Sequence, residues 1–227
     1  MRLDLSRLRI PGLGGWGDDP LWAGVYDWTV EHERVGGRLW RAAINSDLRL
    51  LYDAAAAIGR LPAGSRVLDI PSGGGVALRG LRTGQGVEYV AADISETMLA
   101  RTWASARARD VQDQVTLVPA DVGALPFDDG EFDLVVSFTG LHCFHDPRQA
   151  VTEMVRVLKP GGALTGSALL NDTGIRFAPM RGVGRAAGLL GPGADADALT
   201  GWLTDEGLEQ LSMRTSGAIG YFRGVRG

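Results

Sequence analysis

The sequence has one cysteine, Cys143, and no long hydrophobic run. A single cysteine cannot form an intramolecular disulfide, so the fold does not depend on one. No apolar segment reaches the roughly 20 residues that a membrane-spanning helix needs. The N-terminal residues also lack the apolar core of a signal peptide. These absences favour a cytoplasmic protein that does not span a membrane.

Like charges do not gather along the sequence either. The formal net charge is −4, and the long basic runs typical of nucleic-acid binding are missing. The histidines and the cysteine do not have the spacing of a metal site. The chain has 227 residues, 45% of them hydrophobic, which is enough for one domain with a sizeable core. We therefore expect a small-molecule partner, no nucleic acid and no metal, and a monomer or homodimer.

Short β-type runs alternate with helix-type segments in the middle of the chain. The runs span residues 66–70, 87–93, 115–121, 132–138 and 162–170. This alternation predicts a parallel sheet of the α/β class. Because the runs are hydrophobic on both faces, we expect helices to cover both sides of the sheet.

Two of the connecting helices have clear start signals. Ser95 is expected to cap one helix, with Leu99, Trp103 and Ala106 on a single face. Asp146 is expected to cap another, with Pro147 at its first position. The apolar stripe of this second helix consists of Val151, Met154, Val155 and Leu158. Both helices are interpreted as crossovers between parallel strands.

Three consecutive glycines, Gly73 to Gly75, follow the first expected strand. Ligands of an open parallel sheet bind beyond the carboxyl ends of its strands, and glycine lets backbone and ligand approach closely. Asp93 and Asp121 end the next two expected strands. A carboxylate at the first of these positions suits a ribose diol, and one at the second suits an adenine amine. The backbone N–H of Val122 is then available for an adenine ring nitrogen.

Two other nucleotide motifs fit less well. The dinucleotide fingerprint G-x-G-x-x-G, aligned on Gly73 and Gly75, places Leu78 where its third glycine belongs. A phosphate-binding P-loop is excluded, because no glycine-lysine pair followed by serine or threonine is present. The pattern therefore favours an adenosyl ligand over a dinucleotide.

These residues resemble the class I S-adenosylmethionine-dependent methyltransferases, in particular their UbiE-like, type 11 small-molecule branch. The resemblance covers about residues 66–170 and rests on four ordered elements. They are VLDIPSGGG, YVAADIS with ETML after it, PADVGALPFDDGEFDLVVS, and LHCFHDPRQAVTEMVRVLKPGG. The family's first motif is similar to V-L-D-x-G-x-G-x-G. Asp69, Gly73 and Gly75 match it, whereas Pro71 replaces the first glycine and keeps only its carbonyl for hydrogen bonding.

The resemblance implies S-adenosylmethionine as methyl donor and S-adenosylhomocysteine as product. It places Asp69, Pro71, Gly73 and Gly75 at the methionine end, and Asp93 at the ribose. It further places Ile94 and Met98 near the adenine, Asp121 and Val122 at the adenine edge, and Ser137 and Phe138 beside the sulfonium and the acceptor pocket. Each role has a structural alternative. Asp93 or Asp121 can instead cap a helix, and Met98 can be a core residue.

The resemblance also implies a Rossmann-like, seven-stranded, mostly parallel sheet that ends in an antiparallel hairpin around Gly217. Residues 61–227 form this domain. Residues 1–60 are interpreted as a helical lid, in which Trp22, Tyr26, Trp28 and His32 are candidates for substrate contact. These aromatic residues can instead dock the segment onto the sheet. The glycine-rich segment 171–198 is a variable insertion, either a substrate flap or a connector.

The expected activity is methyl transfer to an O, N or C nucleophile of a small aromatic or apolar molecule. His142 is the candidate general base for acceptors that must lose a proton, with a structural loop histidine as its alternative. Two other functions remain open. One is an NAD-dependent oxidoreductase, and the other is a module that binds S-adenosylmethionine or S-adenosylhomocysteine without catalysis.

Overall fold

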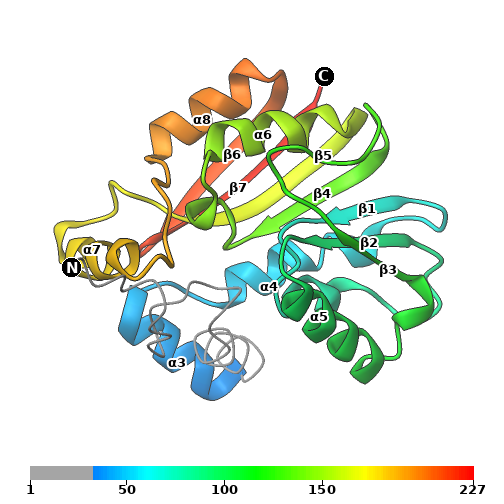
Figure 1. Ribbon diagram of the computed structural model, residues 1–227, viewed down its shortest axis with the longest axis horizontal. Helices are drawn as coiled ribbons and strands as arrows, with labels where there is room; N and C mark the ends of the chain where they lie inside the picture. The colour runs from blue at the N-terminus through cyan, green and yellow to red at the C-terminus, as the bar shows by residue number, and fades with distance from the viewer. Residues whose placement is uncertain (1–32) are drawn as a thin grey trace, which may run out of the picture.

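The computed structural model describes residues 33–227, which form a twisted sheet with helices on both faces (Figure 1). Within these residues the sheet has seven strands in the order β3-β2-β1-β4-β5-β7-β6. The strands are β1 (Arg66–Asp69), β2 (Glu88–Asp93), β3 (Val115–Pro119), β4 (Phe132–Phe138), β5 (Leu158–Leu169), β6 (Leu208–Ser216) and β7 (Ile219–Arg226). The helices are α3 (Glu33–Ile44), α4 (Arg49–Ala55), α5 (Glu96–Ala108), α6 (Pro147–Arg156), α7 (Ala178–Ala186) and α8 (Ala196–Asp205). Short 3-10 turns are η2 (Ile58–Arg60), η3 (Val76–Gly80), η4 (Gln112–Gln114), η5 (Leu141–Cys143) and η6 (Ile175–Phe177).

Strands β1 to β5 pair in parallel, whereas β7 is antiparallel to both β5 and β6. The carboxyl ends of the parallel strands therefore share one edge of the sheet. Because Leu169 pairs with Ile219, the turn between β6 and β7 lies at that same edge. The structure confirms the expected seven-stranded, mostly parallel sheet with its C-terminal hairpin.

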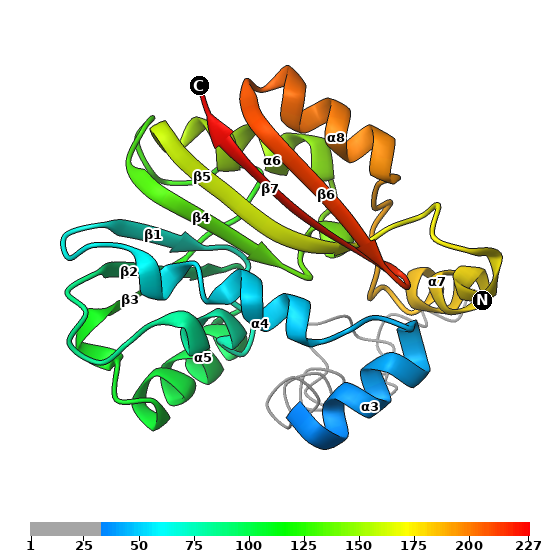
Figure 2. The same ribbon diagram turned by 180° about the vertical axis from the view of Figure 1, so that it is seen from behind.

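Two hydrophobic cores cover the two faces of the sheet. Side chains from α4, η3 and α5 pack on one face, and side chains from α6 and α8 pack on the other. Figure 2 shows these helices from the side opposite to Figure 1. Leu48, Leu51, Ala55 and Ile58 are all buried in the first core. The division of the chain into lid and domain at residue 60 stays a prediction.

Both expected helix caps are present. Ser95 Oγ accepts from the N–H of Met98 at 3.4 Å, and Asp146 Oδ1 accepts from the N–H of Gln149 at 3.0 Å. These bonds satisfy N–H groups that the first helical turn leaves without partners. Leu158, in contrast, is wrongly placed on the helical stripe of α6. It begins β5, where it pairs with Phe132 before a shift in register.

The buried face of α5 also differs from the predicted one. Trp103 is 38% exposed, whereas the neighbouring Thr102 is fully buried. The Thr102 hydroxyl donates to the carbonyl of Gly73 at 2.7 Å, so the helix turns a polar side chain toward the glycine turn. Trp103 is therefore a surface residue, contrary to the amphipathic pattern. None of the helices within residues 33–227 is long and apolar enough to cross a membrane.

Candidate active site

The glycine turn follows β1 at the carboxyl edge of the sheet. Gly73 has a φ of +52° and Gly75 a φ of +83°, a region that other residues rarely adopt. A Cβ at Gly75 would lie 3.0 Å from Leu78 Cδ1 and 3.1 Å from Ser105 Cβ. The turn is thus bare of side chains for reasons of conformation and of packing. It is attached to β2 by a 2.9 Å hydrogen bond from the N–H of Ser72 to the carbonyl of Ala92.

Pro71 lies directly before this turn and packs against Gly140, which follows β4. A Cβ on Gly140 would overlap the ring of Pro71, so Gly140 allows the two loops to pack closely. The proline stands where the family's first glycine is expected. Gly140 is therefore the packing partner of the Pro71 ring.

Asp93 is turned toward the glycine turn. Its Oδ2 accepts from the N–H of Gly73 at 3.0 Å, and its Oδ1 accepts from the N–H of Ser95 at 2.9 Å. The side chain is 5% exposed, and burial raises its pKa although these hydrogen bonds oppose the change. The structure therefore brings Asp93 together with the glycine turn, and the sequence predicts that these two features bind one ligand.

Asp69 ends β1 beneath the same turn. Its carboxyl group is 1% exposed and accepts a 2.6 Å hydrogen bond from the hydroxyl of Tyr89. Burial raises the pKa of Asp69 to about 7, and the charge of Asp93 adds to the shift, while the bond from Tyr89 opposes it. The site thus contains two neighbouring acidic groups that burial makes harder to ionise.

Asp121 lies just beyond β3, which ends two residues before it at Pro119 rather than at the aspartate itself. Asp121 Oδ1 accepts from the N–H of Gly123 at 2.9 Å, which closes a tight turn. The N–H of Val122 has no hydrogen-bond partner in the part of the chain that the structure describes. The turn therefore presents an acidic side chain and an unpaired amide side by side.

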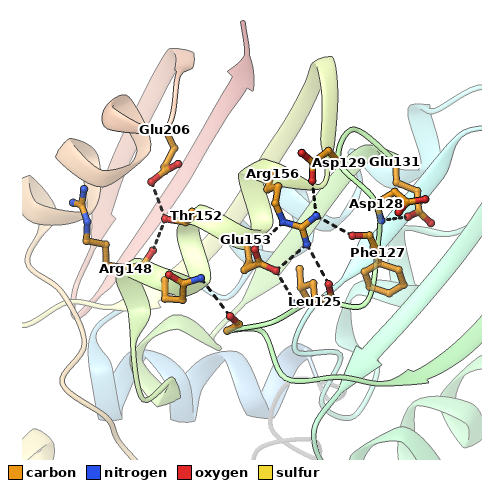
Figure 3. Close-up of polar contacts among 12 residues, drawn as sticks. Leu125, Phe127, Asp128, Asp129, Glu131, Arg148, Thr152, Glu153, Arg156 and Glu206 are labelled. Atoms are coloured by element: carbon orange, nitrogen blue, oxygen red, sulfur yellow. Dashed lines mark hydrogen bonds and ion pairs between the residues drawn. The ribbon is translucent and has the colours of Figure 1, made fainter.

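Helix α6 holds the segment that follows this turn through the side chains of Glu153 and Arg156. The sequence analysis did not predict this role for either residue. Glu153 Oε2 accepts from the N–H of Leu125 at 2.8 Å, and Arg156 donates to the carbonyls of Leu125 at 3.1 Å and Phe127 at 2.9 Å. Arg156 also pairs with Glu153 at 2.7 Å, as Figure 3 shows. This bond lowers the pKa of Glu153. The i, i+3 spacing of Glu153 and Arg156 in the sequence could have predicted this ion pair.

The remaining predicted cofactor residues lie along the same edge in different environments. Met98 is buried in α5, whereas Ile94 is 74% exposed. Ser137 and Phe138 end β4 and are both buried, and Ser137 Oγ has no hydrogen-bond partner in the described structure. Their contacts with a cofactor stay predictions.

His142, the candidate base, is buried in η5. Its Nδ1 accepts from the N–H of Leu169 at 3.1 Å, and burial lowers its pKa to about 4. A neutral imidazole has one acceptor nitrogen, and here the backbone occupies it. The remaining nitrogen then carries the proton. This geometry favours the structural alternative for His142 over the general base.

The other substrate candidates, Trp22, Tyr26, Trp28 and His32, lie outside the described residues. Across the described range, no group of three or more histidine, cysteine or acidic side chains could hold a metal ion.

Comparison with known proteins connects this edge of the sheet to a family. A family model described as a methyltransferase domain matches residues 68–165. The demethylmenaquinone methyltransferase of Clavibacter sepedonicus is 38% identical over 165 residues, which are 72% of this chain and 60% of that protein. The 27-O-demethylrifamycin SV methyltransferase of Amycolatopsis mediterranei is 36% identical over 114 residues, 50% of this chain and 42% of that protein. The chain thus spans less than two thirds of the length of these relatives.

Solved structures agree on the fold. A SAM-dependent methyltransferase from Aquifex aeolicus matches with a TM-score of 0.57 and 18% identity, covering 82% of this chain and 92% of that one. At this identity the likeness concerns the fold alone. The matched domain and these relatives support a class I S-adenosylmethionine-dependent methyltransferase of the UbiE-like type.

Proposed function

We propose that this chain transfers a methyl group from S-adenosylmethionine to an O, N or C nucleophile of a small molecule. One observation carries the proposal: Asp93 at the end of β2 is hydrogen-bonded to the glycine turn after β1. Asp121 and Val122 lie at the end of the next strand, β3. Three neighbouring strand ends thus offer the groups that an adenosyl ligand requires.

The residues present fit this cofactor chemically. Each carboxylate oxygen of Asp93 has a second lone pair, so it can accept from a ribose hydroxyl while it holds the backbone. Asp121 can accept from an adenine amine, and the unpaired N–H of Val122 can donate to a ring nitrogen. The bare glycine turn and the carbonyl of Pro71 would face the methionine end. When bound, the cofactor supplies a methyl group on a sulfonium, which is a good leaving group.

The protein's own contribution is mainly orientation. Holding an acceptor in line with a reactive methyl group replaces a bimolecular encounter, and such positioning can supply about 7–11 kcal/mol of a barrier. His142 does not have a free acceptor nitrogen for proton removal. We therefore propose that the acceptor reaches the site already nucleophilic or loses its proton to water.

The relatives support a small-molecule acceptor. Their names refer to demethylmenaquinone and to 27-O-demethylrifamycin SV. An oxidoreductase is disfavoured because Leu78 is fully buried beneath the glycine turn, where the dinucleotide fingerprint needs its third glycine.

Calorimetric titration of the purified protein with S-adenosylmethionine, S-adenosylhomocysteine and NAD tests the proposal. We expect both adenosyl ligands to bind and NAD not to bind. A screen of phenols, amines and quinone precursors for release of S-adenosylhomocysteine then identifies the acceptor class. Binding of NAD alone would support the oxidoreductase. Binding of both adenosyl ligands without turnover on any acceptor would favour the sensor.

A further inference from the structure

Thr102 is a polar residue on the buried face of α5. Its side chain is fully buried, whereas its neighbour Trp103 is exposed. Apolar burial alone would favour the opposite arrangement, because a tryptophan gains far more than a threonine from leaving water. The burial of Thr102 therefore needs another explanation, which its hydroxyl contacts supply.

The Thr102 hydroxyl contacts the glycine turn at two points. Its Oγ1 donates to the carbonyl of Gly73 at 2.7 Å and lies 3.1 Å from the hydroxyl oxygen of Ser72, which is also buried. Ser105, three residues further along the helix, packs against the same turn. A Cβ on Gly75 would lie 3.1 Å from the Cβ of Ser105. Residues three apart share a helix face, so these two small polar side chains form the surface of α5 on which the turn rests.

Both polar groups of the Gly73 backbone are held by side chains of other elements. The N–H donates to Oδ2 of Asp93 at the end of β2, and the carbonyl accepts from Thr102 of α5. Glycine populates positive and negative φ about equally, so the φ of +52° at Gly73 is not fixed by the residue itself. The two side chains therefore hold a residue that has little conformational preference of its own.

The two side chains do not depend on each other to the same degree. Asp93 has a second bond, to the N–H of Ser95 at 2.9 Å, which remains without Thr102. The carbonyl of Gly73, in contrast, would lose its buried donor. Loss of the Thr102 hydroxyl should therefore loosen the turn more than it displaces the carboxylate. A loosened turn must be ordered when a ligand binds against it, and this ordering reduces affinity.

We propose that Thr102 is a positioning residue for the cofactor, which holds the glycine turn in the conformation that receives the methionine end. The proposal rests on the methyl transfer proposed above and adds a residue outside the predicted cofactor contacts. Thr102 acts through Gly73 rather than by touching the ligand. Its loss should therefore affect a ligand that reaches the turn more than a ligand that ends at the ribose.

Binding of S-adenosylhomocysteine and of 5′-methylthioadenosine tests the proposal. The second ligand keeps the adenosine and the sulfur but lacks the amino acid. Thr102→Val removes the hydroxyl at nearly constant shape, whereas Thr102→Ser keeps it. In calorimetry, Thr102→Val should bind S-adenosylhomocysteine about fivefold less tightly than the wild-type protein, as is typical of one lost hydrogen bond. Its affinity for 5′-methylthioadenosine should fall less, and Thr102→Ser should keep the wild-type ratio of the two affinities.

Thr200→Val is the matched control. Thr200 is a partly buried threonine of α8, on the opposite face of the sheet, and its hydroxyl also donates to a backbone carbonyl, that of Ala196 at 2.8 Å. This variant should keep the wild-type ratio. If Thr102→Val fails to fold, Thr102→Cys decides the matter, because a thiol is a weak donor. Its ratio should be lower than that of Thr102→Ser.

An unchanged ratio in folded Thr102→Val would overturn the proposal, as would an equal fall in Thr200→Val. Equal ratios in Thr102→Cys and Thr102→Ser would also contradict it. Titration of S-adenosylhomocysteine into the wild-type protein separates the two proposals. If that ligand binds and the ratio does not respond to Thr102, only the positioning role is wrong. If that ligand does not bind, the proposed methyl transfer itself fails.

Discussion

The hydroxyl of Tyr89 donates to Oδ2 of Asp69 across 2.6 Å, deep in the first core. The two residues lie on the neighbouring strands β1 and β2, where Asp69 pairs with Ala91, two residues beyond Tyr89. Their side chains therefore project from the same face of the sheet. Burial raises the pKa of both groups, so the phenol stays protonated and the carboxyl group titrates near neutrality.

Asp69 should make the stability of the protein depend on pH. Its pKa is about 7 in the folded chain and 3.8 without the fold. Between these values the folded state binds more protons than the unfolded state, so the free energy of unfolding falls as pH rises from about 4 to about 7. Above that range the contribution is level. Urea unfolding at several pH values should give this slope, and Asp69→Asn should have a smaller one. Identical slopes for the two proteins would contradict the buried, protonated carboxyl group.

Asp93 should be needed for binding of the adenosyl ligand. Asp93→Ala removes the acceptor that we assign to the ribose hydroxyls, so affinity for S-adenosylhomocysteine should fall by about 1–3 kcal/mol. Calorimetry on folded protein measures this loss. Asp146→Ala is a matched control, because Asp146 caps α6 and is not among the predicted cofactor residues. Comparable weakening in both variants would mean that the effect comes from helix capping in general.

His142 should act through structure. Asn offers an acceptor oxygen close to the position of Nδ1, whereas Leu offers none. His142→Asn should therefore keep the bond from the N–H of Leu169, and His142→Leu should lose about 1–3 kcal/mol of stability by leaving that donor unpaired. Neither change should alter the ratio of turnover between strongly and weakly acidic acceptors. A selective loss of turnover on weakly acidic acceptors would restore the general base.

The same histidine gives a second pH dependence, of opposite sign to that of Asp69. Its pKa falls from 6.5 to about 4 on folding. The unfolded state therefore binds more protons in this interval, and stability falls as pH decreases from 6.5 toward 4. His142→Asn should lack this slope. The pH ranges in which Asp69 and His142 titrate overlap. Each variant must therefore be compared with the wild-type protein to separate the two contributions.

Much of this arrangement could be predicted from sequence, because it depends on local signals. Alternating apolar runs, the caps Ser95 and Asp146, and the glycine turn each follow from a few adjacent residues. Thr102 and Trp103 show where such signals fail. An amphipathic pattern favours the tryptophan as the buried residue, but the carbonyl of Gly73 needs a donor and selects the threonine. Arg181 of α7 is buried, and it could not be placed either, since its burial depends on the path of the whole segment 171–198.

Arg156 should affect how well the site distinguishes adenine from other bases. It fixes the segment that follows Asp121 and Val122, through the carbonyls of Leu125 and Phe127 (Figure 3). Arg156→Met should loosen this segment, which must then be ordered on binding, so affinity for S-adenosylhomocysteine should fall by about 1 kcal/mol.

The more specific readout for Arg156 is base selectivity. S-inosylhomocysteine lacks the adenine amine, so it should bind the wild-type protein less tightly than S-adenosylhomocysteine. In Arg156→Met the two affinities should be more alike, because the acceptor carboxylate of Asp121 is less well positioned. Arg148→Met, on the exposed side of α6, should keep the wild-type ratio. A general loss of stability would lower both affinities equally. An unchanged ratio in Arg156→Met would therefore show that the arginine only stabilises the fold.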